Sequence, residues 1–327
     1  MEKRQLGRTD IFLGPFSIGT STLGNVYGEV KFETAQKLCH EIIKKDKYLF
    51  DTSPFYGILK SETVLGKCLQ GIDRDKYYLS SKVGRYGLKE FDYSAKRIKE
   101  SVNESLARLG VDYLDILILH DVEYVDPDIV LQEALPALQQ VKESGKARYI
   151  GFSCEPLQVL KLIIEKSPIQ LDVVISYPHY TLLDDSLSKL FPLLKEKGIG
   201  MINASPLVLG LLTTKSSPPS WHYMTKEKLF ELKQLISTVE AEYKYPIEKA
   251  ALQFPTEEPC VPTTLVGLKG LEEFEFLEQI LKDPIPPHIF SSIKGKMLNN
   301  NITFRDPHYY ELGNYSFVDE DTPKSLP

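Results

Sequence analysis

Four side chains in the first 120 residues are of types that together could move a proton. Asp51 and Tyr56 occur in "YLFDTSPFYG", Lys82 in "LSSKVG" and His120 in "LILHD". A phenol has a pKa of about 10. To act as a general acid and base near pH 7, it needs about 4 kcal/mol of stabilisation of the phenolate relative to the neutral phenol. A cation about 4 Å away contributes on the order of 4 kcal/mol at an effective dielectric near 20, so Lys82 could tune Tyr56. Asp51 would keep the lysine charged, and His120 would donate a hydrogen bond to a substrate oxygen.

Each of these residues also has a structural explanation when it is taken alone. Asp51 before "TSP" could hold a turn, Lys82 could be a solvated strand end, and His120 could be a satisfied core histidine. Perturbed polar groups arise structurally as well as at active sites. However, these three residues lie at the ends of three successive predicted strands, and this clustering favours a functional role.

The strands that must position these residues belong to a regular βα pattern. Eight short β-rich segments alternate with helical patterns, at residues 15–20, 48–52, 78–83, 114–120, 148–153, 173–177, 200–204 and 263–267. The helical periodicity is clearest in residues 93–110, and residues 130–146 and 187–198 repeat it, each with Gly near its end. An α/β fold of this length and rhythm is typical of a (β/α)8 TIM barrel, with a doubly wound sheet as the alternative.

The ends of the chain complete a single predicted domain over residues 1–327. The segment "QLGRTDIFLG" has a turn-like centre between two short extended pieces, which predicts an N-terminal β-hairpin that plugs the N-terminal end of the barrel. From about residue 297 to residue 327 the sequence indicates an irregular C-terminal cap or tail.

Composition excludes several classes of function. The net charge of −6 and the pI near 5.7 argue against a nucleic-acid-binding protein. Apolar runs stay well short of the roughly 18 residues of a membrane helix, and the N-terminus has no apolar signal region. The four cysteines form no CxxC pair, and "PTEEP" lacks a nearby histidine, so we expect reduced thiols, a cytoplasmic protein and no metal site. Oligomeric state is left open.

The order of the four residues, with the strings "FDTSPFYG", "SSKVGRYG" and "LHD", resembles the aldo-keto reductase superfamily. Within it, "SYPHY", "ASPLVLGLLT" and "PPSWH" are similar to sugar 1-dehydrogenases of the L-galactose dehydrogenase type. The resemblance implies an NAD(P)-dependent oxidoreductase that moves hydride between nicotinamide and the anomeric carbon of an aldose, or another small carbonyl substrate. Tyr56 would be the general acid/base, Lys82 and Asp51 would tune it, and His120 would position the substrate.

The resemblance also assigns residues to the cofactor, although ordinary loop chemistry could explain them individually. Ser153 and Cys154 take the positions that hold the carboxamide, and Cys154 replaces a common asparagine. Tyr177 stands where many members have glutamine under the nicotinamide ring. The loop over the pyrophosphate and the start of the adenosine segment are assigned to Ser205, Pro206, Leu207, Gly210 and Gly267.

The residues after the last predicted strand favour NAD over NADP. Glu272 and Glu273 would repel a 2′-phosphate, and Lys269 is the nearby base. A carboxylate can instead accept a hydrogen bond from the 2′-hydroxyl of NAD. Phe276 and Leu277 stand where the family usually has a Glu-Asn pair that contacts adenine.

Four further residues are candidates for substrate contact: Trp221, His222, His179 and Tyr86. Trp221 and His222 could close over a sugar ring or anchor a loop, and His179 could pack beside Tyr180 instead. Two other functions stay open at this level. One is a regulatory subunit that binds nucleotide with little catalysis, and the other is a barrel isomerase or aldolase in which Lys82 forms a Schiff base.

Overall fold

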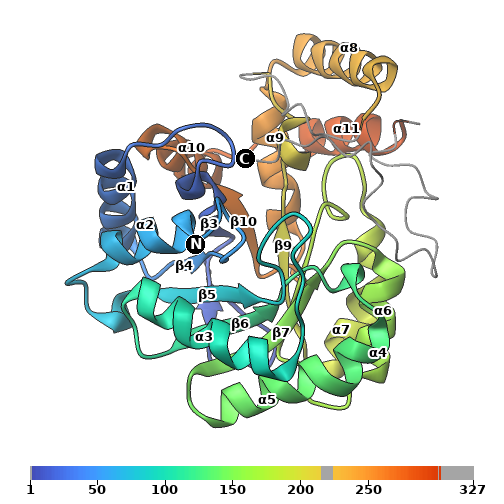
Figure 1. Ribbon diagram of the computed structural model, residues 1–327. Helices are drawn as coiled ribbons and strands as arrows, with labels where there is room; N and C mark the ends of the chain where they lie inside the picture. The colour runs from blue at the N-terminus through green and yellow to red at the C-terminus, as the bar shows by residue number, and fades with distance from the viewer. Residues whose placement is uncertain (1, 215–223, 301, 303–327) are drawn as a thin grey trace.

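Eight parallel strands close into a barrel in the computed structural model, which describes residues 2–214, 224–300 and 302 (Figure 1). The strands follow one another around the barrel in chain order. They are β3 (Phe16–Gly19), β4 (Leu49–Asp51), β5 (Tyr78–Val83), β6 (Leu114–Leu119), β7 (Ala147–Cys154), β8 (Val173–Ser176), β9 (Gly200–Ala204) and β10 (Thr263–Gly267). Each predicted β segment overlaps one of these strands, and β7 extends one residue beyond its predicted segment at each end. The (β/α)8 barrel is therefore confirmed over the doubly wound sheet.

Helices surround the barrel (Figure 1). They are α1 (Phe32–Lys45), α2 (Lys60–Leu69), α3 (Ala95–Leu109), α4 (Pro127–Ile129), α5 (Leu135–Glu143), α6 (Leu157–Lys166), α7 (Phe191–Lys197), α8 (Lys226–Tyr243), α9 (Ile247–Gln253), α10 (Leu271–Lys282) and α11 (Pro287–Leu298). The sequence explains α3 well, because Ser94 caps its first turn and Gly110, at φ 69°, ends it. Among the described residues, none of the helices is both long enough and apolar enough to span a membrane.

Two predicted helices are interrupted near a proline. In residues 130–146 a π-helical turn over Val130–Ala134 precedes α5, and in residues 187–198 a 3₁₀ segment over Ser186–Leu190 precedes α7. Pro136 and Pro192 stand in the first turn of α5 and α7. Proline has no N–H to donate to the preceding turn, so the regular α-helical ladder begins with it rather than running through it.

A hairpin closes the amino-terminal end of the barrel, as predicted. β1 (Arg4–Gln5) pairs antiparallel with β2 (Phe12–Leu13). Gly7 lies in the turn with φ 56°, and a Cβ there would be 2.3 Å from the backbone nitrogen of Gly200. Three buried hairpin residues, Leu6, Ile11 and Leu13, form one apolar cluster with side chains of the strands, namely Leu49, Ile116, Ile118, Val173, Ile175, Ile202 and Leu265.

The last described helix ends close to the predicted start of the irregular tail near residue 297. Helix α11 continues to Leu298, and Met297 is fully buried within it. The apolar side chains of Phe290, Ile293 and Met297 recur at helical spacing and bury one face of α11. Helices α8 and α11 lie side by side at one edge of the molecule (Figure 1). The rest of the predicted tail lies outside the described residues.

Candidate active site

Asp51, Lys82 and His120 meet at the carboxyl ends of three neighbouring strands. Asp51 ends β4, Lys82 lies near the end of β5, and His120 directly follows β6. Lys82 Nζ lies 2.5 Å from Asp51 Oδ2 and donates to the backbone oxygen of Thr52 at 2.9 Å. Asp51 and Lys82 are each only 2% exposed. A buried ion pair of this kind is stable only when both charges are present.

Tyr56 reaches this pair from a loop that is fixed by two glycines. Gly57 has a φ of 61°, and a Cβ there would be 2.1 Å from the carbonyl oxygen of Gly24 in the loop after β3. Only glycine allows this close approach without moving the loop. The Tyr56 ring centre lies 4.6 Å from Lys82 Nζ and 5.6 Å from the His120 ring, edge to face. The structure thus brings all four predicted catalytic residues together.

The charges around Tyr56 do not bring its pKa toward neutrality. Burial raises the pKa of Tyr56 to about 12. The Lys82 cation acts to lower this pKa, but the charges of Asp51 and Asp121 act in the same direction as burial. The Lys82 cation is visible in the sequence, whereas the loss of hydration on burial, which is the larger effect here, depends on the fold.

Lys82 remains an ammonium group, as the sequence predicts. Burial acts to lower the pKa of Lys82, but the negative charge of Asp51 and the contact with Tyr56 more than offset it and leave the pKa raised. The lysine therefore keeps its positive charge beside the phenol.

His120 is buried and neutral. Burial lowers the pKa of His120 to about 3, with Lys82 and Arg85 acting in the same direction and Asp121 opposing them. Its Nδ1 lies 3.0 Å from Ser53 Oγ, and its Nε2 lies 3.5 Å from Asp121 Oδ2. A neutral imidazole offers one N–H donor, and the partners of the ring decide which nitrogen carries it.

Sequence reasoning missed a buried ion pair beside His120. Arg85 Nη1 donates to Asp121 Oδ2 at 2.6 Å, and the guanidinium lies 3.9 Å from the centre of the Phe55 ring. Asp121 has a φ of 52°, which is unusual for a residue other than glycine and is often found at functional sites. The available signal was an acid directly after His120 and a base three residues after Lys82, each just beyond a strand end.

Two predicted cofactor residues join this ion pair. Ser153 Oγ accepts from the Asp121 N–H at 2.8 Å and donates to Asp121 Oδ1 at 3.1 Å. The Tyr177 hydroxyl donates to the same Oδ1 at 3.1 Å, and Glu123 Oε1 lies 3.4 Å from the hydroxyl oxygen. Cys154 is fully buried in a large apolar cluster that is separate from the one beneath the hairpin, and its Sγ lies 3.5 Å from the Pro156 oxygen. Burial raises the pKa of its thiol well above the ordinary value.

The predicted pyrophosphate loop has an unusual backbone. Ser205, Val208, Leu209 and Gly210 all have positive φ, between 48° and 91°, and Val208–Gly210 forms a short 3₁₀ turn. Sparsely populated backbone conformations cluster at ligand sites. Pro206 and Leu207 lie between these residues in the same loop.

Two adjacent strands, β3 and β10, end in glycine. Gly267 at the end of β10 pairs with Gly19 at the end of β3. A Cβ at Gly19 would find its nearest neighbour at 3.7 Å, and one at Gly267 would approach the Thr22 side chain at 3.2 Å. Strand ends without side chains form a cradle that suits the close approach of a phosphate-bearing ligand.

The four predicted substrate residues either contact other protein groups or lie outside the described part of the chain. Tyr86 is buried, its hydroxyl accepts from the Gly84 N–H at 3.1 Å, and Arg97 covers its ring. His179 is partly exposed and pairs with Asp184 at 2.6 Å. Trp221 and His222 lie outside the described residues.

On α10, one acidic residue already has a backbone partner. The carboxylate of Glu273 accepts from the Lys269 N–H at 2.6 Å, at the start of the helix. Leu277 belongs to the core and Phe276 packs against it, so these two positions support the fold of α10. Their burial explains why they depart from the polar pair that the resemblance suggests.

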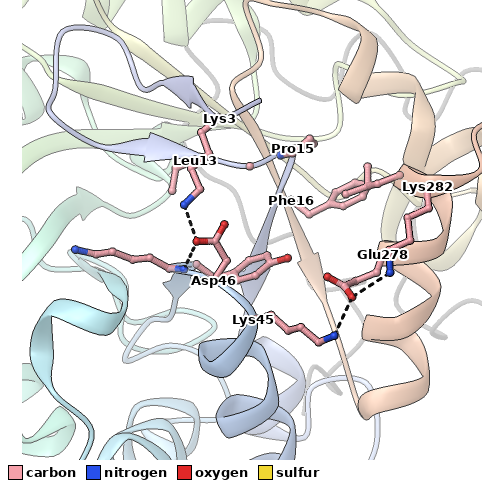
Figure 2. A pocket seen from close by; sticks show the side chains of 12 residues that line it. Lys3, Leu13, Pro15, Phe16, Lys45, Asp46, Glu278 and Lys282 are labelled. Carbon is pink, nitrogen blue, oxygen red and sulfur yellow. Dashed lines mark hydrogen bonds and ion pairs between the residues drawn. The ribbon is translucent and has the colours of Figure 1, made fainter. Parts of the chain in front are cut away.

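A separate pocket lies at the opposite end of the barrel, near the starts of β3 and β4 (Figure 2). Its lysines are partnered: Lys3 contacts Asp46 at 2.6 Å, and Lys45 and Lys282 each lie 3.7 Å from Glu278. Lys47 covers the Tyr78 ring at 4.2 Å. In the described part of the chain, no group of three or more His, Cys, Asp or Glu side chains could hold a metal ion.

The closed parallel barrel, with charged residues buried at the carboxyl ends of its strands, defines an enzyme of the (β/α)8 class. A model of the aldo/keto reductase family matches residues 15–297. The chain therefore belongs to the aldo/keto reductase family and is an oxidoreductase of this type.

Similar proteins include several sugar dehydrogenases. L-galactose dehydrogenase of Arabidopsis thaliana is 39% identical over 279 residues, which cover 84% of this chain and 86% of that protein. D-arabinose 1-dehydrogenase of Saccharomyces cerevisiae is 36% identical over 149 residues, which cover 43% of this chain and 44% of that protein. Among solved structures, the holo form of aldo-keto reductase AKR11C1 from Bacillus halodurans has a TM-score of 0.74 at 25% identity, covering 91% of this chain and 96% of that one.

Proposed function

We propose that the protein is an NAD(P)-dependent aldose 1-dehydrogenase that oxidises the anomeric carbon of an L-galactose-like sugar. The carrying observation is the buried contact of Asp51, Lys82, Tyr56 and His120 at the strand ends, in a chain that is 39% identical to an L-galactose dehydrogenase. Reduction of a small carbonyl compound is the same chemistry in reverse.

In the proposed reaction, Tyr56 takes the proton of the anomeric hydroxyl while C1 loses its hydrogen as hydride. The carbon becomes the carbonyl of a lactone, so two electrons and one proton leave the sugar with the hydride and the phenolate takes up the other proton. Lys82 favours the phenolate, and His120 donates a hydrogen bond to the oxygen at C1. The nicotinamide, when bound, supplies the hydride acceptor.

The described residues fit a nicotinamide dinucleotide. Ser153 and Tyr177 are held beside His120 through Asp121, and the strained loop at Ser205 lies next in chain order after them. The glycines that end β3 and β10 carry no side chains, so the phosphate-bearing part could approach the backbone there. In this proposal the other predicted cofactor residues line that site, and Cys154 supports it from the apolar cluster in which it is buried.

We propose NAD as the preferred cofactor because two acidic side chains, Glu272 and Glu273, begin α10. Their charge would oppose a 2′-phosphate, although the partner that Glu273 already has reduces the strength of this argument. The measurement is the ratio of kcat/KM for NAD and NADP with one sugar. A preference for NADP of about tenfold, roughly 1.4 kcal/mol, would overturn this assignment.

The function itself is tested by following nicotinamide absorbance with a panel of free sugars and aldehydes. L-galactose and stereochemically related aldoses should give the fastest reduction of the cofactor. If cofactor binds but no sugar or aldehyde changes the absorbance, a regulatory nucleotide-binding role replaces the enzymatic one. We also propose a cytoplasmic location, because the four cysteines are free and a reducing compartment keeps thiols in this state.

A further inference from the structure

Ser53 lies against the catalytic histidine, between Asp51 and Tyr56 in the chain. It is fully buried, and its Oγ lies 3.0 Å from His120 Nδ1. The same oxygen accepts the backbone N–H of Phe55 at 3.1 Å. One side chain therefore contacts both the histidine and the loop that carries Tyr56.

The position of the Ser53 hydroxyl hydrogen follows from these contacts. A serine hydroxyl has one hydrogen to donate, and its oxygen can accept other hydrogen bonds. The Phe55 N–H is a donor, so it can only use the oxygen, while His120 Nδ1 can accept if it carries no proton. Donation from Ser53 to Nδ1 satisfies all three groups, and it leaves the single proton of the neutral ring on Nε2.

The other side of the ring favours the same arrangement. His120 Nε2 lies 3.5 Å from Asp121 Oδ2, and the Asp121 carboxylate is held by Arg85. A carboxylate favours an N–H over a lone pair at this distance. The contact is longer than a good hydrogen bond, so the N–H stays available to a second acceptor.

We propose that Ser53 is a positioning residue that fixes His120 as the Nε2–H tautomer and so presents a donor to the substrate oxygen. The role of this donor in catalysis rests on the proposed function. The tautomer itself does not, because it is a property of the enzyme without cofactor or sugar.

The test is a two-dimensional ¹⁵N–¹H spectrum of the histidine rings in enzyme labelled with ¹⁵N-histidine. The chain has six histidines, and the variant His120→Gln identifies the His120 signals by their loss. In the wild-type enzyme near pH 7.5, Nε2 should be protonated and Nδ1 unprotonated. In Ser53→Ala the His120 signals should move toward a mixture of both tautomers, and Ser53→Thr should restore the wild-type pattern.

Ser80 provides a matched control for this experiment. It is fully buried, it pairs with Asp51 across β4 and β5, and its Oγ makes no hydrogen bond among the described residues. Ser80→Ala should leave the His120 signals and kcat unchanged, while Ser53→Ala should lower kcat for a sugar about tenfold with cofactor Kd unchanged. Should Ser53→Ala fail to fold, Ser53→Cys, whose thiol is a weaker donor of similar size, gives the same comparison.

Two results would overturn the inference. One is a wild-type spectrum with the proton on Nδ1, and the other is a Ser53→Ala spectrum that matches the wild type. Absence of activity with every sugar, combined with the expected spectra, would instead remove the proposed function and leave the tautomer assignment intact.

Discussion

The two ends of the barrel use charge in opposite ways. At the amino end, the Lys3 and Asp46 side chains form their ion pair at 35% and 49% exposure, and the neighbouring lysines also lie at the rim of the pocket (Figure 2). At the carboxyl end, Asp51 and Lys82 are each 2% exposed and contact each other at 2.5 Å. Water screens the first pair, whereas the second depends on its protein partners alone. Chemistry is therefore expected at the carboxyl end and structural support at the amino end.

The largest difference in activity between the two ends is expected when one tyrosine hydroxyl is removed from each. We expect Tyr56→Phe to lower kcat for a sugar by about 10² to 10⁴, because the general acid/base is lost while the ring still packs. Steady-state kinetics alongside a cofactor Kd, which should not change, is the measurement. An unchanged kcat would exclude Tyr56 from the mechanism.

Breaking the ion pair at each end of the barrel should change the free energy of unfolding by different amounts. Lys82→Met should lower the free energy of unfolding by about 3–5 kcal/mol, because it leaves the Asp51 carboxylate buried without its partner. Lys3→Met, the matched change at the amino end, should cost less than about 1 kcal/mol. Urea unfolding of both variants gives the comparison.

Loss of the Lys82 cation should also raise the pKa of Tyr56 further, which moves the pH optimum for sugar oxidation upward. If Lys82→Met and Lys3→Met lowered the free energy of unfolding equally, the two ion pairs would not differ as proposed. A pH profile of Lys82→Met identical to that of the wild type would show that Lys82 does not tune Tyr56.

His120 should make the carboxyl end sensitive to acid. Its pKa is about 3 in the folded protein against an ordinary 6.5, so the unfolded chain binds a proton that the folded protein excludes as pH falls below 6.5. Stability is then lost between about pH 6.5 and 3, and the loss from this group between pH 6.5 and 5 is about 2 kcal/mol. Urea unfolding of wild type and His120→Gln at pH 7.5 and 5 should show that the variant loses less stability, by about this amount. An equal loss in both proteins would disprove it.

The smallest expected effect is at the amino end. The Tyr149 hydroxyl donates to Asp10 Oδ1 at 2.9 Å and accepts the Asp10 N–H at 3.0 Å, at an exposed site. Tyr149→Phe should lower stability by about 0.5–1 kcal/mol and leave kcat unchanged, which makes it the counterpart of Tyr56→Phe. A large loss of kcat in this variant would show that the two ends are coupled.

The sequence was sufficient for the barrel and for the four central residues because both depend on local patterns. Strand periodicity placed Asp51 and Lys82 at strand ends, and consecutive strands of a barrel are neighbours, so their contact followed. The hairpin was equally accessible, because turn residues between two extended pieces are a local signal.

The Arg85–Asp121 ion pair could not be obtained in this way. Its two residues come from different loops, and their contact depends on a positive φ at Asp121 and on packing against Phe55. The raised pKa of Tyr56 could not be obtained from sequence for a related reason, since the extent of burial depends on the whole surrounding structure rather than on the charges nearby in sequence.

The hairpin at the foot of the barrel has a consequence for how the chain reaches its native state. Leu6 and Ile11 are among the first residues to be synthesised, yet the apolar layer they complete includes Ile202 and Leu265, from the last two strands. Contacts of such long sequence separation form late, because the intervening chain must first be ordered. A nascent or truncated chain that ends before β10 would therefore keep its N-terminal hairpin undocked and expose that apolar layer, which makes such fragments candidates for aggregation and chaperone binding.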